Sequence, residues 1–200
     1  MDDTENLDSP VILTAIMAET VTLGFTMASE PRTGSLLRTL AGSKPSGAIL
    51  ELGTGTGVAT AWLLDGMDEQ SRLITVEQDP EVASVARKHL GDDPRVTFYV
   101  DDAEQVLARI ADLRFDLIFA DTWVGKYTHL DAALGLLREA GLYVIDDMMP
   151  QANWPDGHAE KVRDLIAVLE AKEDLVLTKM SWASGIIVAT KRGLTDRRGA

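Results

Sequence analysis

The chain has 200 residues, 46% hydrophobic and 26% charged, a composition that is ordinary for one well-buried globular domain. Its 32 Asp and Glu outnumber its 19 Lys and Arg, and the formal net charge of −13 argues against a broad phosphate-binding surface and so against a nucleic-acid partner. The chain has no cysteine, which excludes disulfides, thiolate metal sites and cysteine nucleophiles.

Residues 1–45 are predicted to form a helical lead-in. Ser9-Pro10 is typical of a helix opening, with Ser as the cap and Pro at the first helical position. Apolar residues follow at helical spacing, at Ile12, Leu13, Ile16, Met17 and Val21, and a second short helix is expected over 31–40. The acidic start lacks the positive charge of a signal peptide and no apolar run is long enough to span a bilayer, so we expect a cytoplasmic protein without membrane contact.

From residue 46 to residue 192 the pattern alternates between strand and helix. Strands are predicted at 48–52, 73–76, 96–100, 115–120 and 142–145, and helices at 58–64, after Asp79-Pro80, at 103–111, around Leu130 to Leu137 and around Val162 to Leu169. Two last strands, 175–182 and 186–190, are joined by a link that is too short for a parallel crossover. We therefore predict an α/β fold with a doubly wound, mostly parallel seven-stranded sheet and a C-terminal antiparallel hairpin.

Residues 193–200 are predicted to be a tail. The main basic cluster lies at this end of the chain, at Lys191, Arg192, Arg197 and Arg198. We interpret it as a solvated tail, with an RNA contact as the alternative.

A glycine-rich turn, Glu51-Leu-Gly53-Thr-Gly55-Thr-Gly57, connects the first predicted strand to the helix at 58–64 and so lies at the carboxyl edge of the sheet, where such folds bind ligands. Its glycines allow the backbone to approach a ligand closely. Val58 stands where a dinucleotide fingerprint has its third glycine, and Glu51 would repel a pyrophosphate. A cofactor with ribose and adenine, no phosphate and a positive charge fits better, and S-adenosylmethionine is such a molecule.

Two further strand ends carry acidic residues that suit this cofactor. Glu77 follows the second strand, where a carboxylate can accept hydrogen bonds from both ribose hydroxyls. Asp102 and Ala103 follow the third strand and are expected to meet the adenine edge. The predicted cofactor-binding residues are Glu51, Gly53, Gly55, Gly57, Glu77, Asp102, Ala103 and Asp121.

With these features the chain resembles the class I S-adenosylmethionine-dependent methyltransferases, and more closely the small O-methyltransferases typified by the catechol and caffeoyl-CoA O-methyltransferases. The resemblance runs from about residue 27 to residue 192 and includes Ser29-Glu-Pro-Arg-Thr-Gly-Ser-Leu-Leu37, Ile49-Leu-Glu-Leu-Gly-Thr-Gly-Thr-Gly57, Thr75-Val-Glu-Gln-Asp-Pro80 and Phe115-Asp-Leu-Ile-Phe-Ala-Asp-Thr-Trp123. It implies a Rossmann-like enzyme that transfers a methyl group to a hydroxyl of a small aromatic molecule. It also suggests a homodimer, for which the N-terminal helices could supply the interface.

Three carboxylates, Asp121, Asp146 and Asp147, follow the fourth and fifth strands. Since neighbouring parallel strands end at one edge, these side chains could converge, and convergent oxygens are what Mg²⁺ or Ca²⁺ requires. In the family that the chain resembles, an Asp after strand four and an Asp-Asn pair after strand five hold a metal ion, so the resemblance implies a metal site at Asp121, Asp146 and Asp147. Asp147 replaces the Asn and adds charge. The alternative is that Asp121 helps to bind the cofactor while Asp146 and Asp147 cap the next turn.

The catalytic lysine of that family is missing, because Val124 stands in its place and Lys126 follows two residues later. Lys126 could lower the pKa of an acceptor hydroxyl or take its proton, or it could simply be solvated. By the resemblance, Asp121 lies nearest the line of methyl transfer, and His158 is either a general base or only the start of a helix. The candidate catalytic residues are therefore Asp121, Lys126 and His158.

Aromatic side chains follow Asp121 and the acidic pair, in the loop Asn153 to His158 and at Trp123, Tyr127 and Trp182. They suggest a lid over a flat acceptor, unless Trp154 and Trp182 only pack together under that loop. Two functional alternatives keep the cofactor: a metal-independent methyltransferase or cofactor-binding protein, and an enzyme that methylates a hydroxyl of transfer RNA. A nucleotide-linked dehydrogenase is a third.

Overall fold

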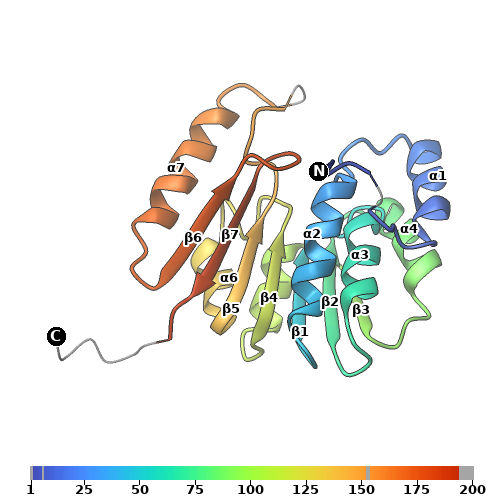
Figure 1. Cartoon of the computed structure of the whole chain (residues 1–200), viewed down its shortest axis with the longest axis horizontal. Coiled ribbons are helices and arrows are strands. Elements are labelled where there is room, and N and C mark those ends of the chain that lie inside the picture. The colour runs from blue at the N-terminus through green and yellow to red at the C-terminus, as the bar shows by residue number, and fades with distance from the viewer. Residues whose placement is uncertain (1, 6, 152–153, 194–200) are drawn as a thin grey trace.

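Seven strands form one sheet in the computed structural model of this chain, which describes residues 2–5, 7–151 and 154–193 (Figure 1). In sequence order they are β1 Ala48–Leu52, β2 Arg72–Glu77, β3 Val96–Val100, β4 Phe115–Ala120, β5 Leu137–Ile145, β6 Leu175–Met180 and β7 Ile186–Lys191. Their spatial order is β3-β2-β1-β4-β5-β7-β6, and only β7 runs antiparallel to its neighbours, β5 and β6. The predicted fold class is confirmed. The predictions for Asn153, Arg197 and Arg198 lie outside the described residues.

Helices cover both faces of this sheet. They are α1 Leu13–Leu23, α2 Pro31–Gly42, α3 Val58–Gly66, α4 Pro80–Leu90, α5 Ala103–Arg109, α6 Leu130–Gly135 and α7 His158–Glu170. Side chains alternate along each strand, so Leu117 packs in the cluster formed with α1 to α4, and Ile118 packs in the cluster formed with α5 to α7. Both residues are completely buried. None of the described helices is long and apolar enough to cross a membrane.

The first helix begins later than predicted and buries a different set of side chains. Ser9 does not cap it: residues 10–12 form a turn, in which Leu13 N donates to Pro10 O (3.0 Å), and the helix begins at Leu13. Its buried side chains include Ile16 and Thr20, whereas Met17 is 43% exposed and Val21 is 75% exposed. The predicted apolar face was therefore wrong for these two side chains. Both side chains lie on the open side of α1. The homodimer through the N-terminal helices stays a prediction.

Two boundaries near the middle and end of the chain also differ from the prediction. Leu137 begins β5 instead of ending the preceding helix, because the strand extends through an irregular stretch with Ala140 at a φ of 59°. Phe115 of β4 pairs with Leu137 of β5, and Leu117 pairs with Leu142. Between these two pairs, β5 therefore contains several more residues than β4. β6 ends at Met180, which leaves 181–185 as the hairpin connection.

Gly57 allows the glycine turn to pack closely against the helix that follows β2. Its φ of 93° is one that side chains rarely tolerate, and a Cβ built there would lie 2.8 Å from the Cβ of Ala86 on α4. The turn, the start of α3 and the middle of α4 therefore fit together only with glycine at this position.

Replacing Gly57 by alanine should lower the free energy of unfolding by about 2–4 kcal/mol, because the variant combines backbone strain with overpacking. Urea unfolding monitored by tryptophan fluorescence measures it. The matched control is Gly135→Ala in α6, where an added Cβ meets nothing within 4 Å. If both substitutions have the same small effect, this account of the turn is wrong.

Candidate active site at the carboxyl edge of the sheet

The glycine turn is fastened to the ends of three strands. Gly53 N and Thr54 N both donate to Val76 O of β2 at 3.0 Å, and Asp121 N donates to Leu52 O at 2.8 Å. Gly53 has a φ of 102°, and a Cβ at this position would lie 2.7 Å from Asp121 O. The end of β4 therefore lies directly against the turn, as the sequence predicted for neighbouring parallel strands.

Glu77 connects the turn to the end of β2. Its Oε2 accepts from Gly55 N (2.9 Å) and its Oε1 accepts from Asp79 N (3.1 Å). Each oxygen of a carboxylate has two lone pairs, so both can accept one more hydrogen bond. The carboxylate is thus held in place by the backbone while it keeps the acceptor capacity that two ribose hydroxyls would need.

Glu51 lies behind the turn, and the cofactor contact predicted for it stays a prediction. Its side chain is 0% exposed, and its Oε2 accepts from Thr60 Oγ1 (2.6 Å) and Thr75 Oγ1 (2.5 Å). Its Oε1 is buried without a partner among the described residues. Burial raises the pKa of Glu51 to about 8, against the two threonine hydrogen bonds, which lower it. A cationic ligand above the turn would favour the charged form.

The acidic residues after β3 serve the local backbone. Asp102 caps α5 by accepting from Glu104 N through Oδ1 (2.7 Å), and Asp101 pairs with Arg109. Ala103 is the first residue of that helix. One Asp102 oxygen is thereby used, and the adenine contact predicted for Asp102 and Ala103 stays a prediction.

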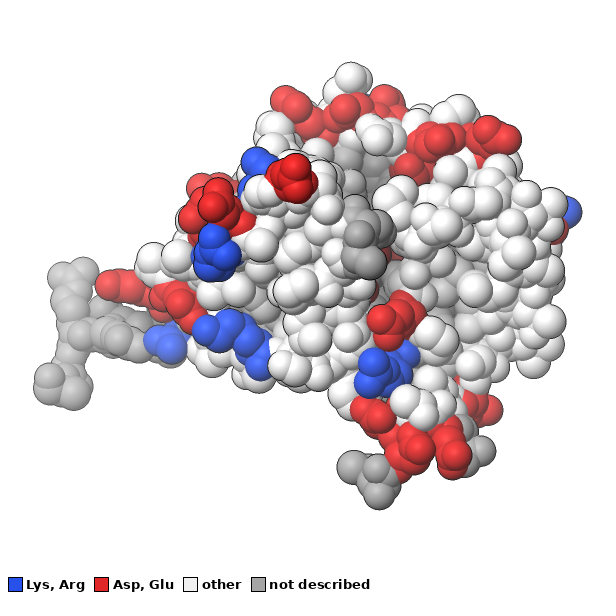
Figure 2. Space-filling view, turned by 90° about the horizontal axis from the view of Figure 1, so that it is seen from above, with Lys and Arg blue, Asp and Glu red and all other residues white. Residues whose placement is uncertain are grey.

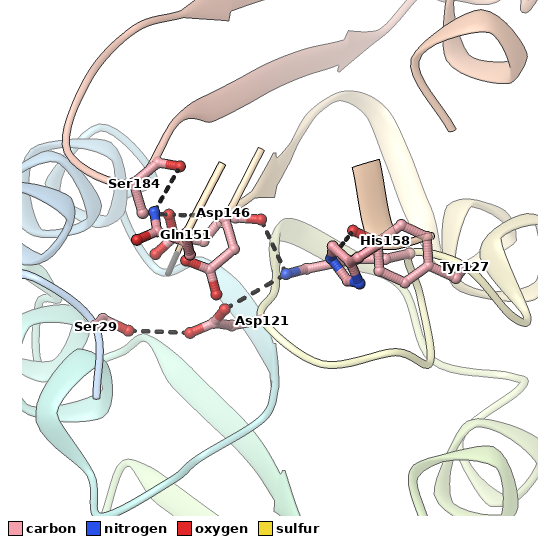
Figure 3. A network of polar contacts seen from close by, with 9 residues as sticks. Ser29, Asp121, Tyr127, Asp146, Gln151, His158 and Ser184 are labelled. Carbon is pink, nitrogen blue, oxygen red and sulfur yellow. Dashed lines mark hydrogen bonds and ion pairs between the residues drawn. The ribbon is translucent and has the colours of Figure 1, made fainter. Parts of the chain in front are cut away.

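Lys126 joins the ends of β4 and β5. Its side chain is only 5% exposed, its Nζ donates to the backbone oxygen of Asp146 (2.9 Å), and it lies 3.5 Å from Asp121 Oδ1. Ser29 donates to the other Asp121 oxygen (3.1 Å), as Figure 3 shows. Burial raises the pKa of Asp121, and the Lys126 charge opposes that rise. The interpretation of Lys126 as a solvated surface residue was wrong.

The two acids after β5, Asp146 and Asp147, differ in what they contact and in their backbone conformation. The Asp146 carboxylate accepts from Ser184 Oγ and, at 2.8 Å, from Asp147 N (Figure 3). Burial raises its pKa as well. Asp147 has a left-handed backbone with a φ of 59°, the conformation of a turn residue. Through its bond to Ser184, Asp146 holds the hairpin connection 181–185.

These contacts bear directly on the metal prediction. Within residues 2–5, 7–151 and 154–193, no three Asp, Glu or His side chains come close enough together to hold a metal ion. Asp121 and Asp146 approach the same point, but an ammonium group lies between the Asp121 carboxylate and the Asp146 carbonyl. The donor set of Asp121, Asp146 and Asp147 does not fit a divalent ion in this arrangement.

An aromatic cluster lies next to Lys126. The His158 ring is in contact with Tyr127 and Trp154, at centroid distances of 5.2 and 4.5 Å, and Trp123 packs against Tyr127 at 5.1 Å. His158 begins α7, and its Nε2 lies 3.1 Å from Tyr127 Oη. Burial lowers the pKa of His158, which favours the neutral ring. The structure thus places His158 with Tyr127 at the start of α7, and the general-base role of His158 stays a prediction.

Trp182 takes no part in that cluster. Its Nε1 donates to Arg32 O (3.2 Å), and the Arg32 guanidinium lies over its ring at 5.6 Å. Trp154 and Trp182 therefore have different partners, contrary to the suggestion that they pack together under one loop.

The lead-in contributes contacts to this edge that were not predicted from the sequence. The segment between α1 and α2 crosses the edge of the sheet: the Phe25 ring lies 3.3 Å from a Cβ built on Gly55, and Ser29 bonds Asp121. Thr20 on α1 donates to Thr56 in the turn (2.8 Å). Ser29 stands in the segment that carried the resemblance, but nothing in its spacing identified Asp121 as its partner.

The fold and this strand edge define a class I methyltransferase. Residues 50–148 match the family described as a methyltransferase domain. A protein of Mycolicibacterium vanbaalenii, named as an O-methyltransferase, is 30% identical in an alignment 174 residues long that covers 82% of this chain and 77% of the relative. The chain belongs to this family, the S-adenosylmethionine-dependent O-methyltransferases.

Solved structures share the fold across almost the whole chain. The O-methyltransferase TomG from Streptomyces achromogenes, in complex with SAM, has a TM-score of 0.82 at 22% identity and covers 96% of this chain and 94% of its own. Cofactor-bound Rv0187 from MTB has a TM-score of 0.83 at 27% identity and covers 95% and 94%. The predicted enzyme class and fold are thereby confirmed.

Glu51 makes the stability of the protein without cofactor depend on pH. The pKa of Glu51 rises from 4.5 in the unfolded chain to about 8 in the folded protein. At a pH between these two values, the folded state keeps a proton on Glu51 that the unfolded state has lost. The free energy of unfolding therefore falls as the pH rises from 4.5 to about 8. In Glu51→Gln this loss is absent. Between pH 5 and pH 8, we expect the variant to gain on the wild type by about 3–4 kcal/mol in free energy of unfolding.

Urea unfolding at the two pH values measures the effect, with Glu173→Gln, a change at an exposed loop residue, as the control. A Glu51→Gln variant that follows the wild type at both pH values would show that the buried carboxyl does not titrate in this way.

Proposed function

We propose that this protein transfers the methyl group of S-adenosylmethionine to a hydroxyl of a small aromatic acceptor at the carboxyl edge of the sheet. The observation that carries the proposal is the position of the Asp121–Lys126 pair. A Cβ built on Gly53 would lie 2.7 Å from Asp121 O, so the acid and the ammonium group lie beside the turn on which the cofactor would rest. A proton acceptor and a positive charge are thus next to the methyl donor.

The residues of the turn fit the cofactor. The glycines let the turn adopt left-handed backbone conformations at the end of β1, and Glu77 keeps acceptor capacity for the ribose. A cationic ligand above the turn would favour the charged form of Glu51, whose Oε1 has no partner among the described residues. When bound, the cofactor would supply a methyl group on a positively charged sulfur. Asp102 and Ala103 are at the end of β3, where they could bind the adenine edge.

Asp121 and Lys126 would share the work on the acceptor. The hydroxyl must lose its proton as its oxygen takes the methyl group, and the Asp121 carboxylate, whose pKa is raised by burial, is a suitable acceptor for that proton. The Lys126 ammonium would stabilise the negative charge that develops on the oxygen. Both groups are held by neighbouring strand ends, so their positions are fixed before the acceptor arrives.

The surroundings favour a flat and uncharged acceptor. Trp123 is 47% exposed and packs against Tyr127, next to the loop that carries Lys126. An aromatic acceptor can stack on such a surface. Figure 2 looks down on this edge and shows acidic side chains spread over it with few basic ones. This surface does not favour transfer RNA, whose phosphates need a basic surface.

The proposal is tested by incubating the enzyme with labelled S-adenosylmethionine and a panel of phenols, aliphatic alcohols and transfer RNA. We expect label in the phenols. Trp123→Ala should raise the KM for the best phenol by about tenfold with a smaller change in kcat, because it removes stacking surface worth about 1 kcal/mol or more. Label that enters only alcohols or RNA would contradict the acceptor class.

Glu77→Ala should weaken binding of S-adenosylhomocysteine by about 10- to 100-fold, since it removes the acceptors of two ribose hydroxyls. Isothermal titration calorimetry measures this, and Glu81→Ala on the exposed first turn of α4 is the control. Unchanged affinity in Glu77→Ala would refute the ribose role. A wild type that binds no S-adenosylhomocysteine would refute the proposed function itself.

A further inference from the structure

We propose that the Lys126 ammonium group is a built-in cation that takes the place of a divalent metal ion in the active site. This inference rests on the proposed function. Its basis is the set of atoms around Nζ: the Asp121 carboxylate at 3.5 Å and the Asp146 carbonyl at 2.9 Å. Two oxygens from the ends of β4 and β5, the two positions predicted to bind a metal, thus converge on an ammonium group.

One oxygen of the Asp146 carboxylate is already occupied. Asp146 Oδ1 accepts from Ser184 Oγ and from Asp147 N, and so fastens the hairpin connection. Asp121 is therefore the carboxylate that faces the ammonium group. A divalent ion at this point would meet the like charge of Lys126 with little water to screen it.

The local backbone explains how a lysine two residues past the expected position reaches this point. Gly125 has a φ of 90°, and a Cβ there would lie 2.7 Å from Leu52 Cδ1. Tyr143 Oη donates to Gly125 O (2.6 Å), and Gly125 N donates to Thr128 O (2.7 Å). Glycine thus lets residues 123–128 press against the sheet, and the next side chain, Lys126, enters the site while Val124 does not.

The ammonium group has a donor left for the acceptor. Of its three N–H bonds, one points to Asp146 O and one to Asp121, which leaves one for an oxygen of the acceptor. In the transfer, the acceptor oxygen forms a bond to the methyl carbon as the carbon–sulfur bond breaks, and that electron pair stays on sulfur. The hydroxyl proton goes to Asp121. Lys126 keeps its proton throughout and acts by its charge.

The test compares Mn²⁺ binding by the wild type and by Lys126→Ala, using electron paramagnetic resonance of free Mn²⁺. We expect no binding by the wild type at millimolar Mn²⁺. Removing the ammonium group frees the Asp121 carboxylate and the Asp146 carbonyl for another cation, so the alanine variant should bind at least tenfold more tightly. Lys161→Ala removes the same charge from an exposed lysine over Trp123 and should gain nothing.

Activity supplies a second readout with any phenol that the wild type methylates. Chelation by EDTA should leave the wild-type rate unchanged, and Lys126→Met should lower kcat by 100-fold or more with little change in KM. Mn²⁺ should restore part of the rate in Lys126→Ala. Wild-type binding of Mn²⁺ that Asp121→Asn abolishes, or an alanine variant that binds no Mn²⁺, would overturn the proposal.

Titration with S-adenosylhomocysteine in EDTA separates this proposal from the one on which it rests. We expect wild type and Lys126→Ala to bind it within a few-fold of each other, which also shows that the variant is folded. If neither binds it, the proposed function fails, while the Mn²⁺ comparison still decides whether Lys126 occupies a cation position.

Discussion

The active-site edge of this enzyme depends on one buried positive charge. Asp121 and Asp146 stand at the ends of adjacent strands, largely removed from water, and burial alone would push both toward their neutral forms. The Lys126 ammonium meets the carboxylate of one and the carbonyl of the other. Without it, an uncompensated buried carboxylate would lie against the glycine turn, an arrangement that is strongly destabilising. The geometry of β4, β5 and the intervening loop is therefore linked through a single side chain.

The same edge is also closed from the other side by the lead-in. Ser29 bonds Asp121, Thr20 bonds Thr56 and the Phe25 ring lies over Gly55, so α1 and the segment after it contact the turn at several points. These contacts come from outside the alternating part of the chain. They place the lead-in against the proposed cofactor site, and the exposed side of α1, with Met17 and Val21, is left on the outer surface.

Much of this architecture could be predicted from the sequence because it has short-range causes. Apolar periodicity gave the strands, and the positions of Gly53 to Gly57, Glu77 and Asp121 followed from where strands end. The partners of those residues could not be predicted, since Ser29 is 92 positions from Asp121 and Ser184 is 38 positions from Asp146. Lys126 was undervalued for a related reason: only the fold of Gly125 against Leu52 and Tyr143 sends its side chain inward. Likewise, Met17 and Val21 have helical spacing, but the neighbours of α1 cover a different side.

The most direct test of a resident ammonium cation is a crystal structure with S-adenosylhomocysteine grown in high Mn²⁺, with anomalous scattering recorded for the metal. We predict Lys126 Nζ between Asp121 and Asp146, next to the sulfur of the cofactor product, and no anomalous peak at that point. A Mn²⁺ peak shared by Asp121, Asp146 and Asp147, with the lysine turned away, would contradict the account.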